Sequence, residues 1–529
     1  VEIEFEPKAK DSRAEYHCGG KKYENKSLEN FWKALKDTNF NADDRFFQLS
    51  EDAHFFGSNG EPSTLFIRKC YNDLLNIVLD NNIRKLRISS SPGIGKTFFG
   101  YYLLYHLASL NKIILYDTNT KSVSNSVMLF EQERACYLHR ESDSSKIRIY
   151  LNNPNVWYIV DDKKPDDVDA KTILICSPVW SHYKDFDNYF GTEIRYMPVW
   201  EWEEIEACRD VMHNHLGKSE VKQLFLRWGG IPRFVLEKAR NPTQQRMLEK
   251  AISVCDEKIF NYIGGSGSGD GISHKLIHIC TNPLIDRSDE DGSDIEVESD
   301  EEVEYVNEEP YTLQSIAFAS DYVGEIMTEK LKSSILGKSQ TQFELSFMMN
   351  IIFEQMAHRI LRNGGTFKVR SLESSKNKRS TQNVKNQNEI LGFSTILTIE
   401  DGKYYRPANK NFPSIGAIIA PDILFQMTAA RNLPINIIGL MKLYSKLGAT
   451  GEISFYFVVP AELYDQFQKQ KFVITDSANV RRMPGWIKTR VKQYALRIDL
   501  SSESLSSGSL LKRRDNSLGE VGSSKKVKK

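Results

Sequence analysis

The sequence has few cysteines and no long apolar run. Its seven cysteines are scattered, and none forms a CxxC pair. An odd, dispersed set of this kind argues against a disulfide framework and against a structural zinc site. It is typical of the reduced thiols of a cytosolic or nuclear protein. No apolar stretch approaches the roughly 20 residues that a transmembrane helix needs, so we expect no membrane span.

The chain also lacks an excess of charge of either sign. Among its 529 residues are 70 Lys and Arg and 70 Asp and Glu, so the formal net charge is zero and does not indicate a nucleic-acid partner. Hydrophobic residues make up 40% and charged residues 26%, which is typical of a globular protein of roughly two to four domains with disordered pieces. The chain begins at Val1 rather than at a methionine, which leaves room for a leader segment upstream.

The clearest motif is a phosphate-binding loop within residues 85–100, KLRISSSPGIGKTFFG. A short β-type run precedes the loop and an apolar, helix-compatible segment follows it. In such a loop the glycines let backbone N–H groups surround a polyphosphate, the lysine reaches the β- and γ-phosphate oxygens, and the threonine hydroxyl binds Mg²⁺. We therefore expect ATP or GTP and Mg²⁺ as cofactors. The expected nucleotide-binding residues are Pro92, Gly93, Ile94, Gly95, Lys96, Thr97 and Phe98.

One position departs from the G-x-x-x-x-G-K-[ST] pattern, because Ser90 occupies the place of the first glycine. A GKT tripeptide that arises by chance in a long chain is the alternative interpretation. The strand before the loop and the apolar helix after it favour the phosphate-binding interpretation.

A second motif, VWYIVDD at residues 156–162, is an apolar strand that ends in two carboxylates. We expect Asp161 to hold Mg²⁺ through water and Asp162 to polarise the attacking water. A strand followed by a plain acidic turn is the alternative. The run at residues 172–177 predicts a further strand, and Ser177 at its end is our candidate sensor of the γ-phosphate. Arg233, which follows the Gly-Gly-Ile-Pro turn, is a second candidate sensor, with an ordinary ion pair at a helix start as the alternative.

Composition shifts divide the chain into five regions. We expect an N-terminal extension at residues 1–45, a nucleotide domain with a helical lid at 46–262, a Gly-rich and acidic linker at 263–309, a second α/β domain at 310–500 and a tail at 501–529. Residues 286–309 contain thirteen acidic residues, which predicts disorder. The tail has two basic clusters spaced like a bipartite nuclear localisation signal, and a merely solubilising tail is the alternative. The clusters are Lys512, Arg513 and Arg514, then Lys525, Lys526, Lys528 and Lys529.

Seven segments, taken in order, resemble the Crinkler effectors of oomycetes and fungi and the related retrotransposon hot spot proteins of trypanosomes. They are LFIRKCYNDL (65–74), SSSPGIGKTFFGYYLLYHL (89–107), YIVDD (158–162), GGIPRFVLEKA (229–239), FASDYVGEI (318–326), IIFEQMAHRILRNGGTF (351–367) and RPANKNFPSIGAIIAPDILFQMT (406–428). The resemblance covers residues 32–467. The N-terminal translocation header that is typical of Crinklers is not recognisable, as expected if a leader precedes Val1.

This resemblance implies a P-loop NTPase, with a parallel sheet and flanking helices, followed by a domain similar to PD-(D/E)xK restriction-type nucleases. It further implies an effector that is secreted and then acts in the nucleus of a host cell. The implied partners are double-stranded DNA and a nuclear import receptor, and a second copy of the chain is a further candidate.

The nuclease-like segment departs from the pattern of its family. That chemistry needs an acid on one strand and an acid-x-lysine on the next, because two carboxylates hold the metal that activates water. Gln426 and Thr428 share one strand face in the place of the second pair. Gly416 stands where similar segments carry an aspartate, and Asp422 is too near Gln426 to replace it. Glu354 remains as the upstream helix carboxylate.

Glu354 and Gln426 are therefore the remaining catalytic candidates of this domain. One carboxylate and one amide form a poor Mg²⁺ site, so we expect DNA cleavage to be weak or lost.

We therefore expect a two-module α/β protein that hydrolyses a nucleoside triphosphate and uses this cycle to engage DNA. An alternative of a different class is a non-cutting module that binds nucleic acid or a host protein, in which nucleotide binding only switches the conformation.

Overall fold

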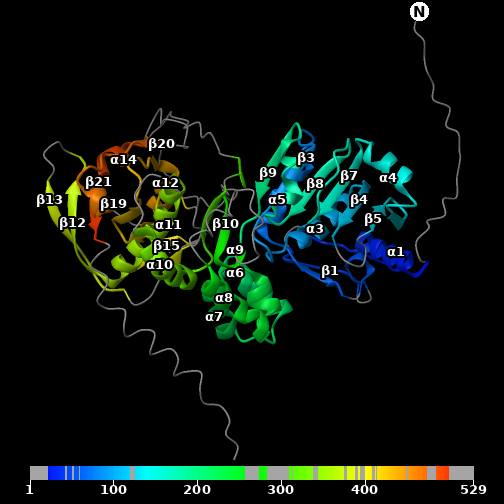
Figure 1. Cartoon of the computed structure of the whole chain (residues 1–529), viewed down its shortest axis with the longest axis horizontal. Helices are drawn as coiled ribbons and strands as arrows, with labels where there is room; N and C mark the ends of the chain where they lie inside the picture. Colours follow the sequence, from blue (N-terminus) through cyan, green and yellow to red (C-terminus); the bar gives the residue numbers. More distant parts are fainter. Residues whose placement is uncertain are drawn as a thin grey trace, which may run out of the picture. The chain divides into compact units, whose positions relative to one another are not determined.

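The computed structural model places the described residues in two compact units, which are considered separately (Figure 1). The described residues are 22–41, 44–50, 53–58, 60–119, 125–255, 273–282, 309–312, 314–336, 343–373, 378–387, 391–393, 400–407, 412, 414–447, 451–473 and 484–499. The first unit contains those up to 253, with 273–282 and those between 309 and 319. The second contains 254–255 and those from 320 to 499.

The first unit is built on a seven-stranded sheet with the order β6-β5-β4-β7-β8-β3-β9. The five strands from β4 to β9 in this order are parallel, and β5 and β6 continue the sheet antiparallel. The strands are β3 (Lys85–Ser89), β4 (Ile113–Thr118), β5 (Ser126–Phe130), β6 (Ala135–His139), β7 (Val156–Asp161), β8 (Lys171–Cys176) and β9 (Thr192–Tyr196). β7 and β8 are buried along their whole length, as expected of parallel strands that are covered on both faces.

Helices cover both faces of this sheet. Ile147 of α4 (Ser144–Leu151) packs in a buried cluster with Tyr158 and Leu174, which lie on one face. On the other face, α3 (Lys96–Ser109) comes so close that a Cβ on Gly100 would lie 2.5 Å from the Tyr116 hydroxyl. The first unit is therefore a three-layer α/β/α structure.

Further elements complete the first unit. They are α1 (Lys22–Asp37), β1 (Phe46–Gln48), η1 (Phe55–Gly57), β2 (Thr64–Phe66), α2 (Lys69–Leu79), α5 (Trp180–Tyr183), η2 (Phe186–Asn188), α6 (Trp202–Met212), α7 (Lys218–Trp228), η3 (Arg233–Glu237), α8 (Pro242–Val254), α9 (Ser273–Leu276), β10 (Ile277–Cys280) and β11 (Ser315–Phe318). Figure 1 shows α6, α7 and α8 gathered as a helical group. The stacked rings of Trp228 and Phe234, 3.9 Å apart, join α7 to η3.

The second unit is built on an eight-stranded mixed sheet with the order β13-β12-β21-β19-β17-β16-β15-β14. Its strands are β12 (Gly365–Ser371), β13 (Arg379–Val384), β14 (Leu391–Phe393), β15 (Tyr404–Pro407), β16 (Ala417–Ile419), β17 (Ile423–Met427), β19 (Ile453–Pro460) and β21 (Val491–Ile498). The strands β17, β19 and β21 are parallel, and β16 is antiparallel to β17. The remaining elements are α10 (Asp321–Leu336), α11 (Phe343–Asn363), β18 (Ile435–Asn436), α12 (Ile437–Leu447), α13 (Ala461–Tyr464), β20 (Phe472–Val473) and α14 (Gly485–Arg490).

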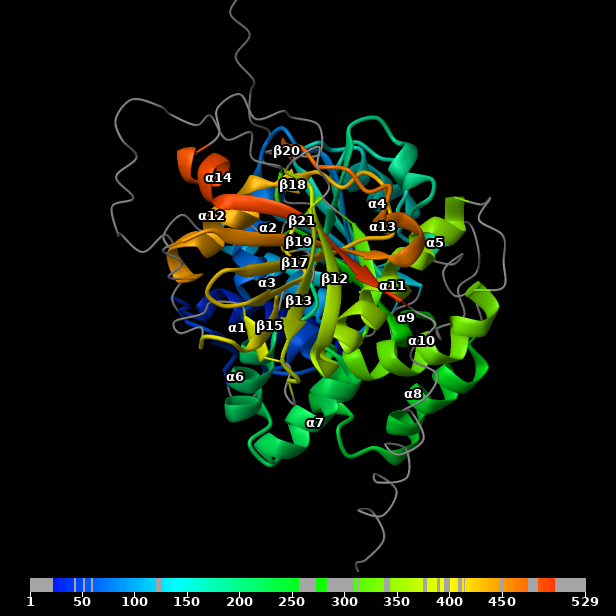
Figure 2. The same ribbon diagram turned by 90° about the vertical axis from the view of Figure 1, so that its left-hand side faces the viewer.

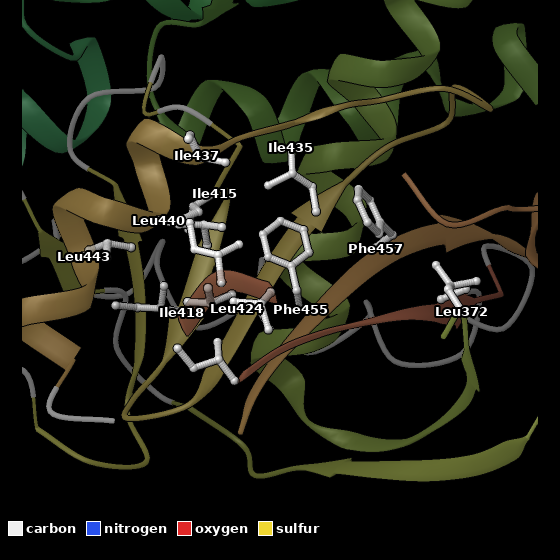
Figure 3. Packing of buried hydrophobic residues seen from close by; sticks show 14 of the residues in the cluster. Leu372, Ile415, Ile418, Leu424, Ile435, Ile437, Leu440, Leu443, Phe455 and Phe457 are labelled. Carbon is white, nitrogen blue, oxygen red and sulfur yellow. The ribbon is translucent and has the colours of Figure 1, made fainter. Parts of the chain in front are cut away.

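Two apolar clusters lie on the two faces of this mixed sheet. One joins Leu424 and Phe455 of the sheet to Leu440 of α12 (Figure 3). The other joins Phe425 of the sheet to Phe353 of α11. In Figure 2, α12 and α14 accordingly lie on one side of the strands and α11 on the other. The side-chain alternation of the strands explains why neighbouring residues such as Leu424 and Phe425 enter different clusters.

The expected α/β class is confirmed, since both units combine helices with sheets that contain parallel strands. Within the described residues, no helix is long and apolar enough to cross a membrane. The six cysteines in this part of the chain are buried, and none of them forms a disulfide bond there. The predicted tail at 501–529, with its two basic clusters, and the acidic run at 286–308 lie outside the described residues.

The structure differs from the expected linker at one place. Residues 273–282 lie within the stretch that we assigned to a Gly-rich and acidic linker, yet they form α9 and β10 of the first unit. The physical reason is the apolar run at Leu276, Ile277 and Ile279, whose side chains are buried. β10 pairs with β11, which comes from more than 30 residues further along the chain.

Candidate nucleotide-binding site

The loop between β3 and α3 has the backbone that its glycines predict. Gly93 and Gly95 have φ values of 84° and 99°, in the left-handed region that glycine adopts without a steric penalty. The loop is held from outside by two donors, since the Tyr71 hydroxyl donates to the carbonyl of Gly95 at 2.7 Å and Trp200 Nε1 donates to that of Ile94 at 2.6 Å. The turn is therefore fixed by contacts with α2 and with the segment after β9.

Lys96 is the first residue of α3, and its side chain turns back over the loop. Its Nζ donates to the carbonyl oxygens of Ser90 at 3.2 Å and Ser91 at 2.9 Å. Only 8% of the residue is exposed. Burial lowers the pKa of Lys96 to about 8, and the nearby carboxylates of Asp162 and Asp161 act in the opposite direction. The lysine thus lies within electrostatic reach of both acids predicted from the sequence.

Asp161 is the last residue of β7 and is only 4% exposed. Burial raises the pKa of its carboxyl group to about 6, while the hydrogen bonds from the hydroxyls of Thr97 and Tyr116 act in the opposite direction. The Tyr116 hydroxyl lies 3.4 Å from Oδ2. Thr97 and Asp161 are therefore neighbours in the structure. That both of them hold one ion stays a prediction.

Asp162 turns away from the strand into a more open position. It has a φ of 53°, its N–H donates to the carbonyl of Ile175 at 2.7 Å, and its side chain is about half exposed. Its Oδ1 accepts a hydrogen bond from the backbone N–H of Ser177 at 3.3 Å and lies 3.4 Å from Nδ1 of His182. Ser177 thus contacts Asp162 through its backbone N–H. The expected contact of its side chain with a phosphate stays a prediction.

Arg233 lies against the glycines of the loop. Its N–H donates to the carbonyl of Gly93 at 3.4 Å, and its charge acts on the pKa of Lys96. Pro92 and Ile94 are part of the same turn, and Phe98 on the first turn of α3 is 37% exposed. The loop, Lys96, Thr97, both acids and Arg233 are accordingly neighbours, at the ends of β3 and β7.

A further buried acid lies next to this site, and its role was not predicted from the sequence. Asp117 lies in β4 beside β7 and is fully buried. Its carboxylate accepts hydrogen bonds from Nζ of Lys163 at 2.9 Å, from the hydroxyl of Tyr158 at 3.0 Å and from Arg140. Since Lys163 follows Asp162, this cluster fixes the turn that carries Asp162. The available signal was an aspartate directly after the apolar run at residues 113–116.

The structure does not bring together the two catalytic candidates of the second unit. Side-chain alternation directs Gln426 to the face of β17 that also carries Leu424, which packs with α12. Glu354 belongs to α11, which packs on the opposite face through Phe353. Thr428, the partner expected beside Gln426, is buried directly after the strand. Among the described residues, no group of three His, Cys, Asp or Glu side chains could hold a metal ion.

Glu354 is instead part of a polar cluster on α11. Its carboxylate lies 3.6 Å from Nε2 of His358, whose Nδ1 shares a 2.6 Å hydrogen bond with the Tyr404 hydroxyl. A small pocket beside this pair is lined by polar and charged side chains, including Arg406, which pairs with Asp321 at 2.6 Å.

Comparison with known proteins gives two curated relatives. None of the protein-family models matches the chain. The chain is 27% identical over 437 residues to Crinkler effector protein 16 of Phytophthora infestans, and 26% identical over 436 residues to Crinkler effector protein 15 of the same organism. Each match covers 77% of this chain and 64% of the relative, so the chain spans less than two thirds of their length. The protein is thus similar to Crinkler effector proteins, which agrees with the resemblance found in its motifs.

Proposed function

We propose that the first unit binds a nucleoside triphosphate with Mg²⁺ and hydrolyses it. The observation that carries this proposal is the meeting of Lys96, Thr97 and Asp161 where β3 and β7 end. A lysine over a glycine loop, at the start of a helix, is suited to the β- and γ-phosphates of a nucleotide.

Thr97 and Asp161 fit a Mg²⁺ ion. Their hydroxyl and carboxylate oxygens are ligands that this ion accepts, and a second positive charge beside the buried Asp161 would favour its ionised form. The remaining positions would be filled by phosphate oxygens and water, since Mg²⁺ usually keeps several waters and binds through one or two protein groups plus substrate phosphates. When bound, the ion would neutralise charge that develops on the phosphates.

The residues of the chain supply positioning and charge rather than covalent chemistry. Lys96 would neutralise phosphate oxygens, and Arg233 would add a second positive charge beside Gly93. The half-exposed carboxylate of Asp162, oriented by the N–H of Ser177, would accept a hydrogen bond from the attacking water and so align it.

Phosphate release by the full chain with ATP or GTP and Mg²⁺ tests this proposal. The variant Lys96→Ala should lose turnover, whereas Lys112→Ala, which removes an exposed lysine before β4, should keep it. Equal turnover in the wild type and in Lys96→Ala would reject the site.

We also propose that the protein is a Crinkler-type effector, secreted and then imported into the nucleus of a host cell. The similarity to two Crinkler effector proteins supports the first part. The basic clusters at residues 512–514 and 525–529 support the second. A fluorescent fusion expressed in a host cell should accumulate in the nucleus. A version with both clusters changed to alanine should remain outside, and equal nuclear accumulation of the two would reject this import signal.

For the second unit we propose a nuclease-like domain that engages DNA with little or no cleavage. The absence of a carboxylate at Gly416 and Gln426 supports this, as does the separation of Gln426 from Glu354 by the sheet. The same observation supports the alternative. In it, the module binds nucleic acid or a host protein, and the nucleotide only switches its shape.

Incubation of the protein with plasmid DNA and Mg²⁺ or Mn²⁺ separates these two candidates. The variant Gly416→Asp supplies the missing acid. Its Cβ would lie 3.0 Å from Sδ of the flexible Met427 side chain and in ordinary contact with the Phe425 carbonyl oxygen, at 3.5 Å. Nicking by the wild type that Gln426→Ala abolishes would reject the binding-only alternative. Cleavage by the Gly416→Asp variant alone would establish a degenerate nuclease.

A further inference from the structure

Tyr116 of β4 reaches the proposed metal-binding acid from the neighbouring strand. β4 and β7 are parallel neighbours, and Tyr116 lies opposite Ile159, two residues before Asp161. Because side chains alternate along a strand, Tyr116 and Asp161 lie on the same face of the sheet. The Tyr116 hydroxyl donates to Oδ2 of Asp161 at 3.4 Å, and both side chains are buried. The contact therefore joins a tyrosine outside the sequence motifs to an acid that those motifs predicted.

Gly100 of α3 leaves the space that this hydroxyl occupies. A Cβ at this position would lie 2.5 Å from the Tyr116 hydroxyl oxygen but 3.4 Å from the ring carbon Cζ. The glycine is thus needed for the hydroxyl rather than for the ring. A glycine inside a helix is less favourable than an alanine, so α3 gives up intrinsic stability at the point where it makes room for the hydroxyl.

The ring of Tyr116 is fixed by aromatic neighbours. The ring centroid of Phe56, from η1, lies 4.9 Å from that of Tyr116 and 5.0 Å from that of Tyr101, and both pairs meet edge to face. The hydroxyl of Tyr101, on α3, donates instead to Glu61 at 2.8 Å. A ring packed on its neighbours in this way has little freedom to turn. The Tyr116 hydroxyl is therefore kept directed at the carboxylate.

A hydroxyl donor at this place has two effects on a metal-binding carboxylate. A phenol hydroxyl is protonated near pH 7, so it can donate to an ionised carboxylate. Such a bond favours the ionised form that a metal ion requires, and it fixes the orientation of the carboxylate. Loss of a hydrogen-bonding partner of a metal ligand typically weakens metal binding by about ten- to a hundredfold. An effect of this size is readily measured.

We propose that Tyr116 is a positioning residue of the proposed metal site, whose hydroxyl holds the Asp161 carboxylate in the orientation that serves Mg²⁺. This inference rests on the proposed function, since it needs Mg²⁺ and a nucleotide at the loop. It adds to that function a residue on β4, a strand that carries neither of the two sequence motifs. The hydroxyl acts through Asp161, so its removal should affect the metal ion and leave nucleotide binding without metal unchanged.

Binding of Mn²⁺, a paramagnetic substitute for Mg²⁺, to the full chain with a non-hydrolysable triphosphate tests this inference. The electron paramagnetic resonance signal of free Mn²⁺ gives the affinity. Tyr116→Phe should weaken Mn²⁺ binding about ten- to a hundredfold, because the carboxylate loses its donor. Its nucleotide affinity in the presence of a metal chelator should equal that of the wild type.

Tyr150→Phe is the matched control. It removes the same atom from another hydrogen bond between a tyrosine and a carboxylate of the first unit, from Tyr150 of α4 to Glu131 at 2.8 Å. Both variants should unfold at a somewhat lower temperature than the wild type, since each loses one hydrogen bond. Only Tyr116→Phe should change the affinity for Mn²⁺.

Three results would overturn the inference and leave the proposed function intact. Equal Mn²⁺ affinity in the wild type and in Tyr116→Phe would show that the hydroxyl does not position the acid. An equal loss of Mn²⁺ affinity in both variants would show a general effect of lost stability. Weaker nucleotide binding by Tyr116→Phe without metal would assign the residue to the loop. Absence of Mn²⁺ binding to the wild type with nucleotide would instead reject the proposed function, and this inference with it.

Discussion

Gly93 and Arg233 are so close that a Cβ added to the glycine would lie 3.1 Å from the Cβ of the arginine. This contact joins the phosphate loop to the turn after α7, although 140 residues separate the two in the sequence. Since Gly93 also has a φ of 84°, a side chain there is opposed both by the backbone conformation and by lack of space.

The variant Gly93→Ala should therefore weaken nucleotide binding more than its loss of stability alone explains. Gly191→Ala is the matched control, because Gly191 has a φ of 72° and no neighbour within 4 Å of the added Cβ. We expect each variant to lose about 1–2 kcal/mol of unfolding free energy through its backbone strain, and only Gly93→Ala to weaken nucleotide affinity. Equal affinity in the two variants would show that the contact with Arg233 does not shape the site.

Asp117 should be a main source of stability for the first unit. Its buried carboxylate accepts three hydrogen bonds, two of them from Arg140 and Lys163. Removal of one partner of a buried ion pair costs about 3–5 kcal/mol, so Asp117→Ala should lower the urea midpoint of the full chain strongly. Asp166→Ala removes an exposed carboxylate 4.0 Å from the same arginine and should change the midpoint little. Similar midpoints for the two variants would contradict this assignment.

Asp161 should lower the stability of the folded chain, although the proposed function needs it. Burial raises the pKa of its carboxyl group to about 6, compared with about 3.9 for an unfolded chain, so the folded state binds a proton more tightly than the unfolded state. The wild type should therefore lose stability as the pH rises from about 4 to 6, and Asp161→Asn should be more stable by about 2 kcal/mol at pH 7.5 without metal. The same variant should lose Mg²⁺-dependent turnover. If Asp161→Asn unfolds at a lower temperature than the wild type, the cost of burying the ionised carboxylate is already compensated in the wild type.

His358 predicts a pH dependence for the second unit. Burial lowers the pKa of its imidazole to about 4, and the positive charge of Arg406 acts in the same direction. Because the unfolded chain takes up a proton near pH 6.5 and the folded one only near 4, stability should be complete above 6.5 and fall as the pH drops toward 4. The loss should reach about 2–3 kcal/mol.

The unfolding midpoints at pH 7.5 and pH 5 check this dependence. His358→Gln keeps a partner for Tyr404 but cannot take up a proton, so its midpoint should fall less than that of the wild type. His215→Gln, which changes an exposed histidine, should behave as the wild type does. An equal fall in all three proteins would assign the pH dependence to other groups.

The sequence predicted those parts of the site that depend on short segments. β3 and β7 are apolar runs that end in polar residues, and the carboxyl ends of parallel strands meet at the same edge of a sheet. This rule is enough to bring Lys96 near Asp161. The alternation along the strand likewise predicted that Gln426 and Thr428 share one face, although it could not show that Glu354 belongs to a helix on the other face.

The parts that were missed depend on partners distant in the sequence. β10 and β11 are separated in the sequence by residues 281–314, and β10 follows a Gly-rich stretch. No local pattern therefore predicts that the two strands pair. The three partners of Asp117 come from β7 and from two separate charged segments. Such contacts are determined by packing of the whole unit rather than by periodicity within one segment.

A crystal structure of the chain with a non-hydrolysable triphosphate and Mg²⁺ would test the central claim most directly. We predict density for the phosphates over residues 92–97, with Nζ of Lys96 on the β- and γ-phosphate oxygens and the ion between Thr97 and Asp161. A nucleotide bound elsewhere in the chain, or an ion that contacts neither residue, would contradict the account.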